Sequence, residues 1–122
     1  MSIGLKRVLI VDDAVFMRMV LKDILVKLDF QIVGEAGNGE EAVLKYEELR
    51  PDLTTLDLTM PKVDGISALR AILTLDPYAN VVICSASGEV EKVQEALSLG
   101  AKDFIVKPFN PNKVTEILKK YA

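Results

Sequence analysis

Hydrophobic positions along the chain form two kinds of pattern that alternate from one end to the other. Short, nearly continuous apolar runs bounded by turn residues or charges are typical of buried strands. Five such runs occur, at 7–11, 32–36, 53–58, 80–85 and 104–106. After each run, apolar residues recur at spacings of three and four, as on one face of a helix. This pattern predicts five helices, at about 16–28, 40–49, 66–75, 89–99 and 112–121.

The regular succession of strand and helix predicts the fold class. Parallel neighbouring strands need a crossover, usually a helix, and strands that are buried on both faces have continuous apolar runs. We therefore expect an α/β fold: a doubly wound parallel sheet of five strands with helices on both faces. Ligands of such sheets bind beyond the carboxyl ends of the strands, where the strand order reverses. Residues 1–122 are expected to form one domain without an output domain.

The composition fits this fold and excludes several classes of protein. The longest unbroken apolar runs have four residues, whereas a membrane-spanning helix needs about 20, so we expect no membrane insertion. A single cysteine cannot form an internal disulfide, which fits a cytoplasmic location. The chain has 18 acidic and 15 basic residues, a net charge of −3, and this balance argues against a nucleic-acid partner.

The chain contains no histidine, and this absence restricts its chemistry. Nucleophilic mechanisms that pair serine or cysteine with histidine are excluded, and so is every metal site that depends on imidazole. The chemistry that remains uses carboxylates, lysine, hydroxyl groups or a hard metal ion.

Polar residues mark the ends of four predicted strands, and a parallel sheet brings these ends to one edge. They are Asp12 and Asp13 after the first strand, Asp57 in the third, Ser85 in the fourth and Lys107 after the fifth. By itself, Asp13 is explained equally well as the N-cap of the following helix. Taken alone, Asp12 and Asp57 suit turns and Lys107 suits a solvated surface, whereas Ser85 is uninformative.

The combination of these residues is more informative than any one of them. Three carboxylates at one edge repel one another and need a compensating cation. Mg²⁺ suits a few carboxylates with water and phosphate oxygens, whereas Ca²⁺ prefers more oxygen ligands than these residues offer. Lys107 adds a fixed positive charge and Ser85 a hydroxyl group. A nucleophile, a metal and donors aimed at developing negative charge are what phosphoryl transfer requires.

The same residues lie in motifs that resemble the receiver domains of two-component response regulators. These motifs are residues 8–13 with their paired aspartates, Asp57 with Met60-Pro61 and Asp64-Gly65, and Lys107-Pro108-Phe109. The resemblance covers essentially the whole chain. Residues 16–18 and 101–104 are similar to single-domain chemotaxis regulators of this family. The resemblance implies a flavodoxin-like fold with strand order 2-1-3-4-5.

The resemblance also implies a role for each polar residue. Asp57 would accept a phosphoryl group from a phosphohistidine on a histidine kinase. Asp13, Asp57 and the backbone carbonyl of Thr59 would ligate Mg²⁺, and Asp12 would help to hold the metal, partly through water. Lys107 would pair with a phosphoryl oxygen, and its bond to Pro108 would be cis.

Ser85 and Phe104 occupy the switch positions of the family. The resemblance implies that phosphate draws Ser85 inward and that Phe104 packs into the vacated space. The face made of the fourth helix, fifth strand and fifth helix would then change its affinity for a target. Chemotaxis makes a flagellar motor switch protein the expected target, and a phosphatase is a further expected partner. Many chemotaxis regulators have tyrosine where this chain has Phe104, so a mechanism that needs that hydroxyl is in doubt.

Three alternatives stay open at this point. The first is a sporulation-type phosphorelay intermediate, which passes its phosphoryl group to a second histidine protein. The second is a small Mg²⁺-dependent phosphatase, although Thr59 occupies the position where haloacid-dehalogenase-like enzymes carry a general acid. The third is a degenerate receiver that only binds a partner. The receiver interpretation predicts no enzyme in the ordinary sense, because the protein would catalyse only its own phosphorylation and dephosphorylation.

Overall fold

The computed structural model describes residues 5–60 and 62–122, in which strands and helices alternate as predicted. Pro61, which belongs to the Met60-Pro61 motif, lies outside the described residues. The strands are β1 (Arg7–Val11), β2 (Gln31–Ala36), β3 (Leu53–Asp57), β4 (Val81–Ala86) and β5 (Asp103–Lys107). The helices are α1 (Val15–Lys27), α2 (Gly39–Leu49), α3 (Gly65–Leu75), α4 (Val90–Leu99) and α5 (Pro111–Leu118). The last helix ends earlier than expected, because the chain tightens into a 3₁₀ helix, η1 (Lys119–Tyr121).

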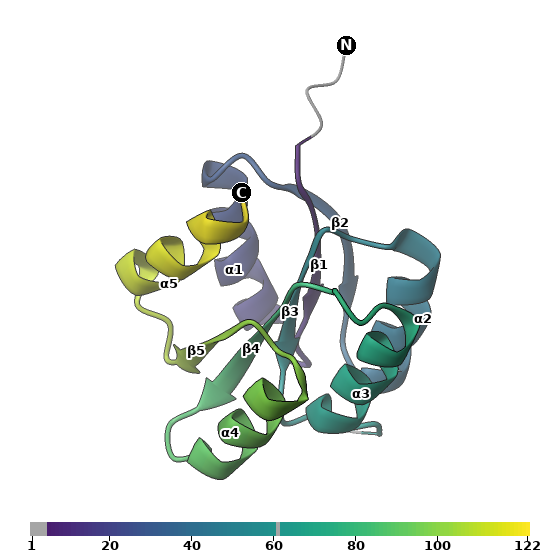
Figure 1. The fold of residues 1–122 in the computed structure, drawn as a ribbon. Coiled ribbons are helices and arrows are strands. Elements are labelled where there is room, and N and C mark those ends of the chain that lie inside the picture. Colours follow the sequence, from purple (N-terminus) through teal and green to yellow (C-terminus); the bar gives the residue numbers. More distant parts are fainter. Residues whose placement is uncertain (1–4, 61) are drawn as a thin grey trace.

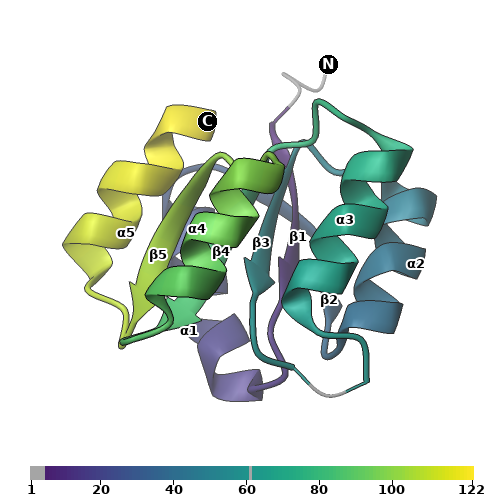
Figure 2. The ribbon, with the colours of Figure 1, turned by 60° about the horizontal axis from the view of Figure 1, so that its bottom comes forward.

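The strands form one parallel sheet in the order β2-β1-β3-β4-β5, which confirms the predicted fold. Helices α1 and α5 cover one face of this sheet, and α2, α3 and α4 cover the other (Figure 1). Figure 2 shows α3 and α4 in front of the sheet with α1 behind it. Among the described residues, no helix is long and apolar enough to cross a membrane.

Two layers of apolar side chains fill the space between the sheet and its helices. The layer under α2, α3 and α4 includes Leu9, Tyr46, Leu56, Leu69, Ile72 and Ile83. The layer under α1 and α5 includes Val8, Ile10, Leu21, Leu25, Leu53 and Leu118. Every residue of the central strand β3 is buried, including Asp57 at its end. A strand held from both faces gives that carboxylate a rigid support.

Side chains cap three of the helices in the ordinary way. Asn38, Asp64 and Asn110 accept hydrogen bonds from the first-turn N–H groups of α2, α3 and α5. Helix α1 differs, because it follows Ala14, whose N–H donates to Asp12 Oδ1 at 2.9 Å. Within the described residues no side chain caps α1, so the interpretation of Asp13 as its N-cap is wrong. The Asp13 carboxylate is therefore free for another role.

Gly65 explains part of the Asp64-Gly65 motif by close packing. A Cβ atom at this position would lie 2.3 Å from the backbone oxygen of Asp57 and 2.4 Å from Cα of Leu58. The start of α3 thus rests directly against the end of β3. Its Gly65 N–H donates to the Leu58 carbonyl oxygen at 3.0 Å, which fixes the contact.

We expect Gly65→Ala to lower the free energy of unfolding by about 1–3 kcal/mol, because the added methyl group forces two backbone segments apart. Urea unfolding followed by circular dichroism measures the change. Gly37→Ala is the matched control, since its Cβ would meet Arg18 Nη1 at an ordinary 3.7 Å. Equal stability of the two variants would contradict the packing role of Gly65.

Candidate functional site

Four strand ends bring the predicted polar residues together at the carboxyl edge of the sheet. Asp12 and Asp13 follow β1, and Asp57 is the last residue of β3. One carboxylate oxygen from each of the three lies within 4.8 Å of the others. Asp12 and Asp57 are buried and Asp13 is exposed, so the cluster opens to solvent on one side. The sequence prediction of a three-carboxylate cluster is confirmed.

Lys107 ends β5 and reaches back into this cluster. Its Nζ lies 2.7 Å from Asp12 Oδ2 and 3.3 Å from Asp57 Oδ2. Burial by itself would lower the pKa of Lys107, but its hydrogen bonds and charge contacts with the two aspartates raise it above its usual value. The ammonium group therefore stays protonated at neutral pH. The Lys107–Pro108 peptide bond is cis, in agreement with the expectation.

The carboxyl group of Asp57 is electrostatically strained. Burial and the negative charge of Asp12 raise the pKa of Asp57 to about 6, although Lys107 and the Thr59 N–H both oppose the rise. The Thr59 N–H donates to Asp57 Oδ1 at 3.4 Å. Three carboxylates and one ammonium sum to two negative charges, which one divalent cation would neutralise. The donor set of carboxylate oxygens fits Mg²⁺ in this respect.

The raised pKa of Asp57 predicts how stability depends on pH in a buffer free of divalent metals. Its value is 3.8 in the unperturbed group and about 6 in the folded protein, so the folded state holds the proton more tightly. Protonation of Asp57 therefore stabilises the folded state. This contribution to the free energy of unfolding, about 3 kcal/mol, is complete below pH ~4 and is lost as pH rises through about 6. Urea unfolding of the wild type and Asp57→Asn at several pH values isolates this contribution. Identical pH profiles for the two proteins would contradict it.

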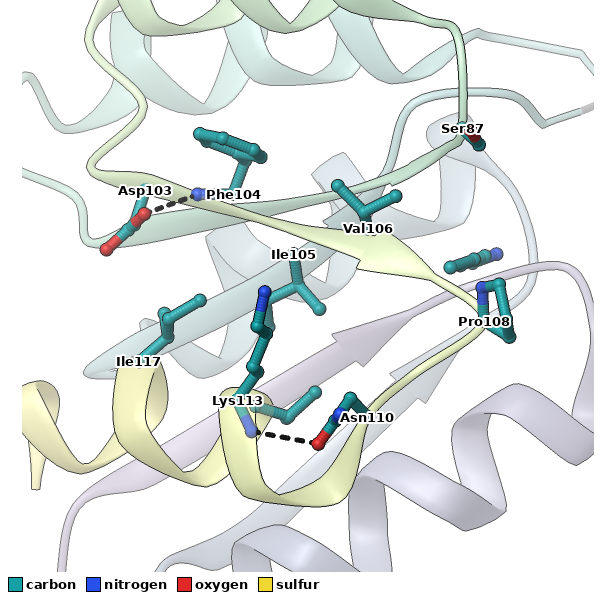
Figure 3. A pocket seen from close by; sticks show the side chains of 11 residues that line it. Ser87, Asp103, Phe104, Ile105, Val106, Pro108, Asn110, Lys113 and Ile117 are labelled. Atoms are coloured by element: carbon teal, nitrogen blue, oxygen red, sulfur yellow. Dashed lines mark hydrogen bonds between the residues drawn. The ribbon is translucent and has the colours of Figure 1, made fainter.

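Ser85 and Phe104, the predicted switch residues, lie in different surroundings. Ser85 is only 1% exposed and follows Cys84, the β4 partner of Asp57, so it lies near the same edge of the sheet as the carboxylates. Phe104 is 39% exposed and extends from β5 on the side of α4 (Figure 3). A groove of about 570 Å³ runs along β5 and α5 past Phe104, Val106 and Lys113. Ser85 is thus buried at the end of β4, whereas Phe104 lies on the surface.

Two further residues support the site, and sequence reasoning did not single them out. Arg18 Nη1 donates to the backbone oxygen of Asp12, and its Nε donates to Glu35 Oε1 at 3.0 Å. Glu35 Oε2 also forms an ion pair with Lys22 Nζ at 3.1 Å. Arg18 appeared in the sequence only as part of the motif 16–18. No spacing in the sequence indicates that it braces the loop after β1.

Glu89 is the second such residue. Its Oε2 accepts a hydrogen bond from the Thr59 hydroxyl at 2.6 Å, and its Oε1 accepts one from the Ala86 N–H at 2.7 Å. The Thr59 bond is the main cause that holds the pKa of Glu89 below its usual range, against partial burial and together with Ala86 and Lys92. The only sequence signal is an acidic residue at a helix start, which has many ordinary explanations.

Comparison with known proteins agrees with the fold and the site. The family description "Response regulator receiver domain" matches residues 8–119. The chain belongs to this family. Among curated relatives, the chemotaxis protein CheY of Thermotoga maritima is 57% identical, over 96% of this chain and 98% of that protein. CheY of Bacillus subtilis is 55% identical, over 93% of this chain and 95% of that protein.

Solved structures of receivers superpose closely on this one. The CheX–CheY–BeF3–Mg complex from Borrelia burgdorferi contains a chain with a TM-score of 0.90 and 44% identity, covering 94% of this chain and 87% of that chain. The receiver domain of AraT from Geobacillus stearothermophilus has a TM-score of 0.89 at 28% identity, covering 96% and 92%. The chain is thus a CheY-like receiver of the two-component type. Receivers bind Mg²⁺ through an aspartate cluster such as the one described above.

Proposed function

We propose that Asp57 accepts a phosphoryl group from the phosphohistidine of a histidine kinase. The observation that carries the proposal is the environment of Asp57, a buried carboxylate 3.3 Å from Lys107 at the end of the central strand. One of its oxygens would attack the phosphorus atom while the bond between phosphorus and the imidazole nitrogen breaks. The donor must be another protein, because this chain has no histidine.

The neighbouring groups divide the work of this transfer. Lys107 meets the negative charge that develops on the phosphoryl oxygens, and the Thr59 N–H orients the acceptor carboxylate through Oδ1. Ser85, buried near the end of β4, would donate its hydroxyl to the phosphoryl group after transfer. Asp13, Asp57 and the Thr59 carbonyl would hold Mg²⁺, with Asp12 behind them. The metal supplies charge neutralisation for the phosphoryl oxygens.

The surface beside the open side of the cluster suits a protein donor. Val15 and Phe16, which begin α1 just after Asp13, are 61% and 66% exposed. They lead into a groove of about 670 Å³ between α1 and α5, lined by Phe16, Met19, Val20, Ile24 and Pro111. Exposed apolar patches of this kind mark protein contacts. We assign the patch to the kinase, since it adjoins the carboxylate that takes the phosphoryl group.

The output surface is proposed to be the face formed by α4, β5 and α5. Four large apolar side chains are exposed on it: Val90, Leu97, Phe104 and Val106. Lys107 joins this face to the site, because β5 carries Phe104 and Val106 and ends at Lys107. A pull on the Lys107 ammonium by a phosphoryl group would act directly on this strand. Movement of Ser85 toward the phosphoryl group would open space for Phe104.

We further propose that the target of this face is the flagellar motor switch. The support is similarity to chemotaxis proteins, four of which exceed 50% identity over at least 93% of this chain. The Borrelia relative is found in a complex with a CheX protein, BeF3 and magnesium. A phosphatase would complete the set of partners. The chain itself is then a regulated substrate and not an enzyme in the ordinary sense.

Intact-protein mass tests this function directly. Incubation with phosphoramidate, whose bond between phosphorus and nitrogen resembles that of phosphohistidine, should add one phosphoryl group in the presence of Mg²⁺. With a chelator the gain should be about 10²-fold slower or more, since metal neutralisation contributes several kcal/mol. Mass is the suitable readout because the chain has no tryptophan for fluorescence. No gain under any condition would overturn the proposal in favour of a receiver that only binds a partner.

A further inference from the structure

Glu89 connects two loops at the carboxyl edge that are distant in sequence. It stands at the N-cap position of α4, and its side chain is 17% exposed. One carboxylate oxygen accepts from the Thr59 hydroxyl at 2.6 Å, and the other accepts from the Ala86 N–H at 2.7 Å. We call these two hydrogen bonds the Glu89 bridge. Thr59 lies in the loop after β3 and Ala86 ends β4, so the bridge ties both to the start of α4.

The Glu89 bridge belongs to a closed circuit of contacts that includes Asp57. The Thr59 N–H donates to Asp57 Oδ1 at 3.4 Å, while the Thr59 hydroxyl donates to Glu89. From Glu89 the circuit returns through Ala86 to β4, whose residue Cys84 is the register partner of Asp57. Thr59 is therefore held by its backbone on one side and by its side chain on the other. If either of these two hydrogen bonds is removed, the exposed residue Thr59 keeps only the other one.

We propose that Glu89 is a positioning residue of the acceptor site, which acts by holding Thr59 against Asp57. The proposal rests on the function proposed above, in which the Thr59 carbonyl is a metal ligand and its N–H orients the acceptor. A hydrogen bond to an ionised carboxylate is stronger than one between neutral groups, so it restricts the Thr59 side chain effectively. Held in this way, the loop loses less conformational entropy when Mg²⁺ binds.

The geometry distinguishes positioning from two simpler roles of an acid at this place. An acid that only capped α4 would direct its oxygens at the first-turn N–H groups of that helix, and Glu89 instead reaches Thr59 and Ala86. An acid that only contributed charge would do so from any exposed place nearby. Lys92 Nζ lies 3.5 Å from Glu89 Oε2 and offsets part of its charge. The specific bond to Thr59 is thus the feature that requires explanation.

The test compares single and double variants of the full chain. Thr59→Val removes the hydroxyl and keeps the backbone and the shape, Glu89→Ala removes the carboxylate, and a third protein carries both changes. Glu91→Ala is the matched control, since Glu91 is an exposed acid in the first turn of the same helix. Calorimetric titration with Mg²⁺ gives the dissociation constant of the unphosphorylated protein. Mass gain with phosphoramidate at saturating Mg²⁺ gives the transfer rate separately.

We expect Thr59→Val and Glu89→Ala each to raise the Mg²⁺ dissociation constant by about threefold to tenfold, the range of one hydrogen bond. The double variant should show the same increase in the dissociation constant as each single variant, because both changes break the same Thr59–Glu89 hydrogen bond. Glu89→Gln keeps an acceptor for the Thr59 hydroxyl and should recover part of the loss. Glu91→Ala should leave the constant unchanged. If Glu89 had a role only in folding, its variants would have a lower unfolding temperature, and their Mg²⁺ dissociation constants would not follow the relations given above.

Three outcomes would overturn the proposal. Factors that multiply in the double variant would show that Glu89 acts independently of Thr59. A loss in Glu91→Ala equal to that in Glu89→Ala would show an effect of charge alone. If Glu89→Ala fails to fold, Thr59→Val decides by itself, because Thr59 is an exposed loop residue whose substitution should leave the fold intact. An unchanged Mg²⁺ dissociation constant in Thr59→Val would refute the role of the Glu89 bridge. A wild type without mass gain would contradict the proposed function, and the Mg²⁺ titration would still decide the role of Glu89.

Discussion

Asp57→Asn is expected to abolish the Mg²⁺-dependent gain of a phosphoryl group while the fold stays intact. The amide has almost the shape of the carboxylate but lacks a nucleophilic oxygen, and no histidine is present to replace it. Loss of one negative charge from the cluster also relieves the repulsion between Asp57 and Asp12, so the metal-free variant should unfold at a higher temperature. Intact mass and thermal unfolding measure the two effects on the same sample.

Asp23→Asn is a suitable control for this experiment. Asp23 is an exposed aspartate on α1 whose carboxylate pairs with Lys27 at 3.1 Å, and it is not one of the three clustered aspartates. This variant should gain the phosphoryl group at the wild-type rate. A gain in Asp57→Asn equal to that of the control would mean that another residue is the acceptor. Fragment masses after proteolysis would then identify that residue.

The Lys107→Ala variant is expected to accept the phosphoryl group, but its phosphorylation should change the target affinity of the α4–β5–α5 face very little. The Lys107 ammonium is the contact by which the site reaches the end of β5. Without it, the strand that carries Phe104 and Val106 has no charged group drawn toward the phosphoryl oxygens. Allosteric coupling typically changes affinity by roughly 5- to 150-fold, and we expect the effect of phosphorylation on target affinity to fall from this range to near one in the variant. Titration of a motor switch protein with phosphorylated and unphosphorylated variant measures it.

Lys113→Ala is the matched control for the lysine variant. Lys113 lies on α5 beside the same groove as Phe104 (Figure 3) and is exposed. Among the described residues, Asp12 and Asp57 form their ion pairs with Lys107. Removal of Lys113 also takes one positive charge from the face, so general charge effects appear equally in both variants. Normal phosphorylation-dependent affinity in Lys107→Ala would refute the coupling role of this residue. The proposed path from Asp57 to β5 would then have to run through Ser85 alone.

The sheet and most of the site could be predicted because both depend on local patterns. Continuous apolar runs define the strands, and parallel order then places Asp12, Asp57 and Lys107 at one edge whatever the loops do. The alternative that Asp13 caps α1 was wrong for two reasons. The Ala14 N–H donates to the Asp12 carboxylate, and α1 starts one residue too late for Asp13 to be its N-cap. Two adjacent aspartates are equivalent in sequence, and only backbone geometry separates their roles.

The supporting contacts could not be predicted, since they join residues that are remote in sequence. Thr59 and Glu89 are 30 residues apart, and Arg18 and Glu35 are 17 apart. Whether such side chains meet depends on how helices lie on the sheet, to within about one ångström. Gly65 is a related case: the motif was visible, but its cause is the backbone of β3 directly beneath it. Pairwise distances of this kind leave no periodic signal.

The raised pKa of Asp57 has a consequence for how this chain can change over generations. The cluster to which we assign the chemistry is held together against its own repulsion, and it is separate from the two apolar layers under the helices. On the proposed function, a substitution that removes the Asp57 carboxylate would therefore end phosphorylation and raise the stability of the metal-free protein in one step. Selection for robustness alone would erode the signal, and duplicated copies freed from signalling should drift toward inert, long-lived binding proteins. Laboratory evolution for heat resistance needs a signalling requirement to keep Asp57.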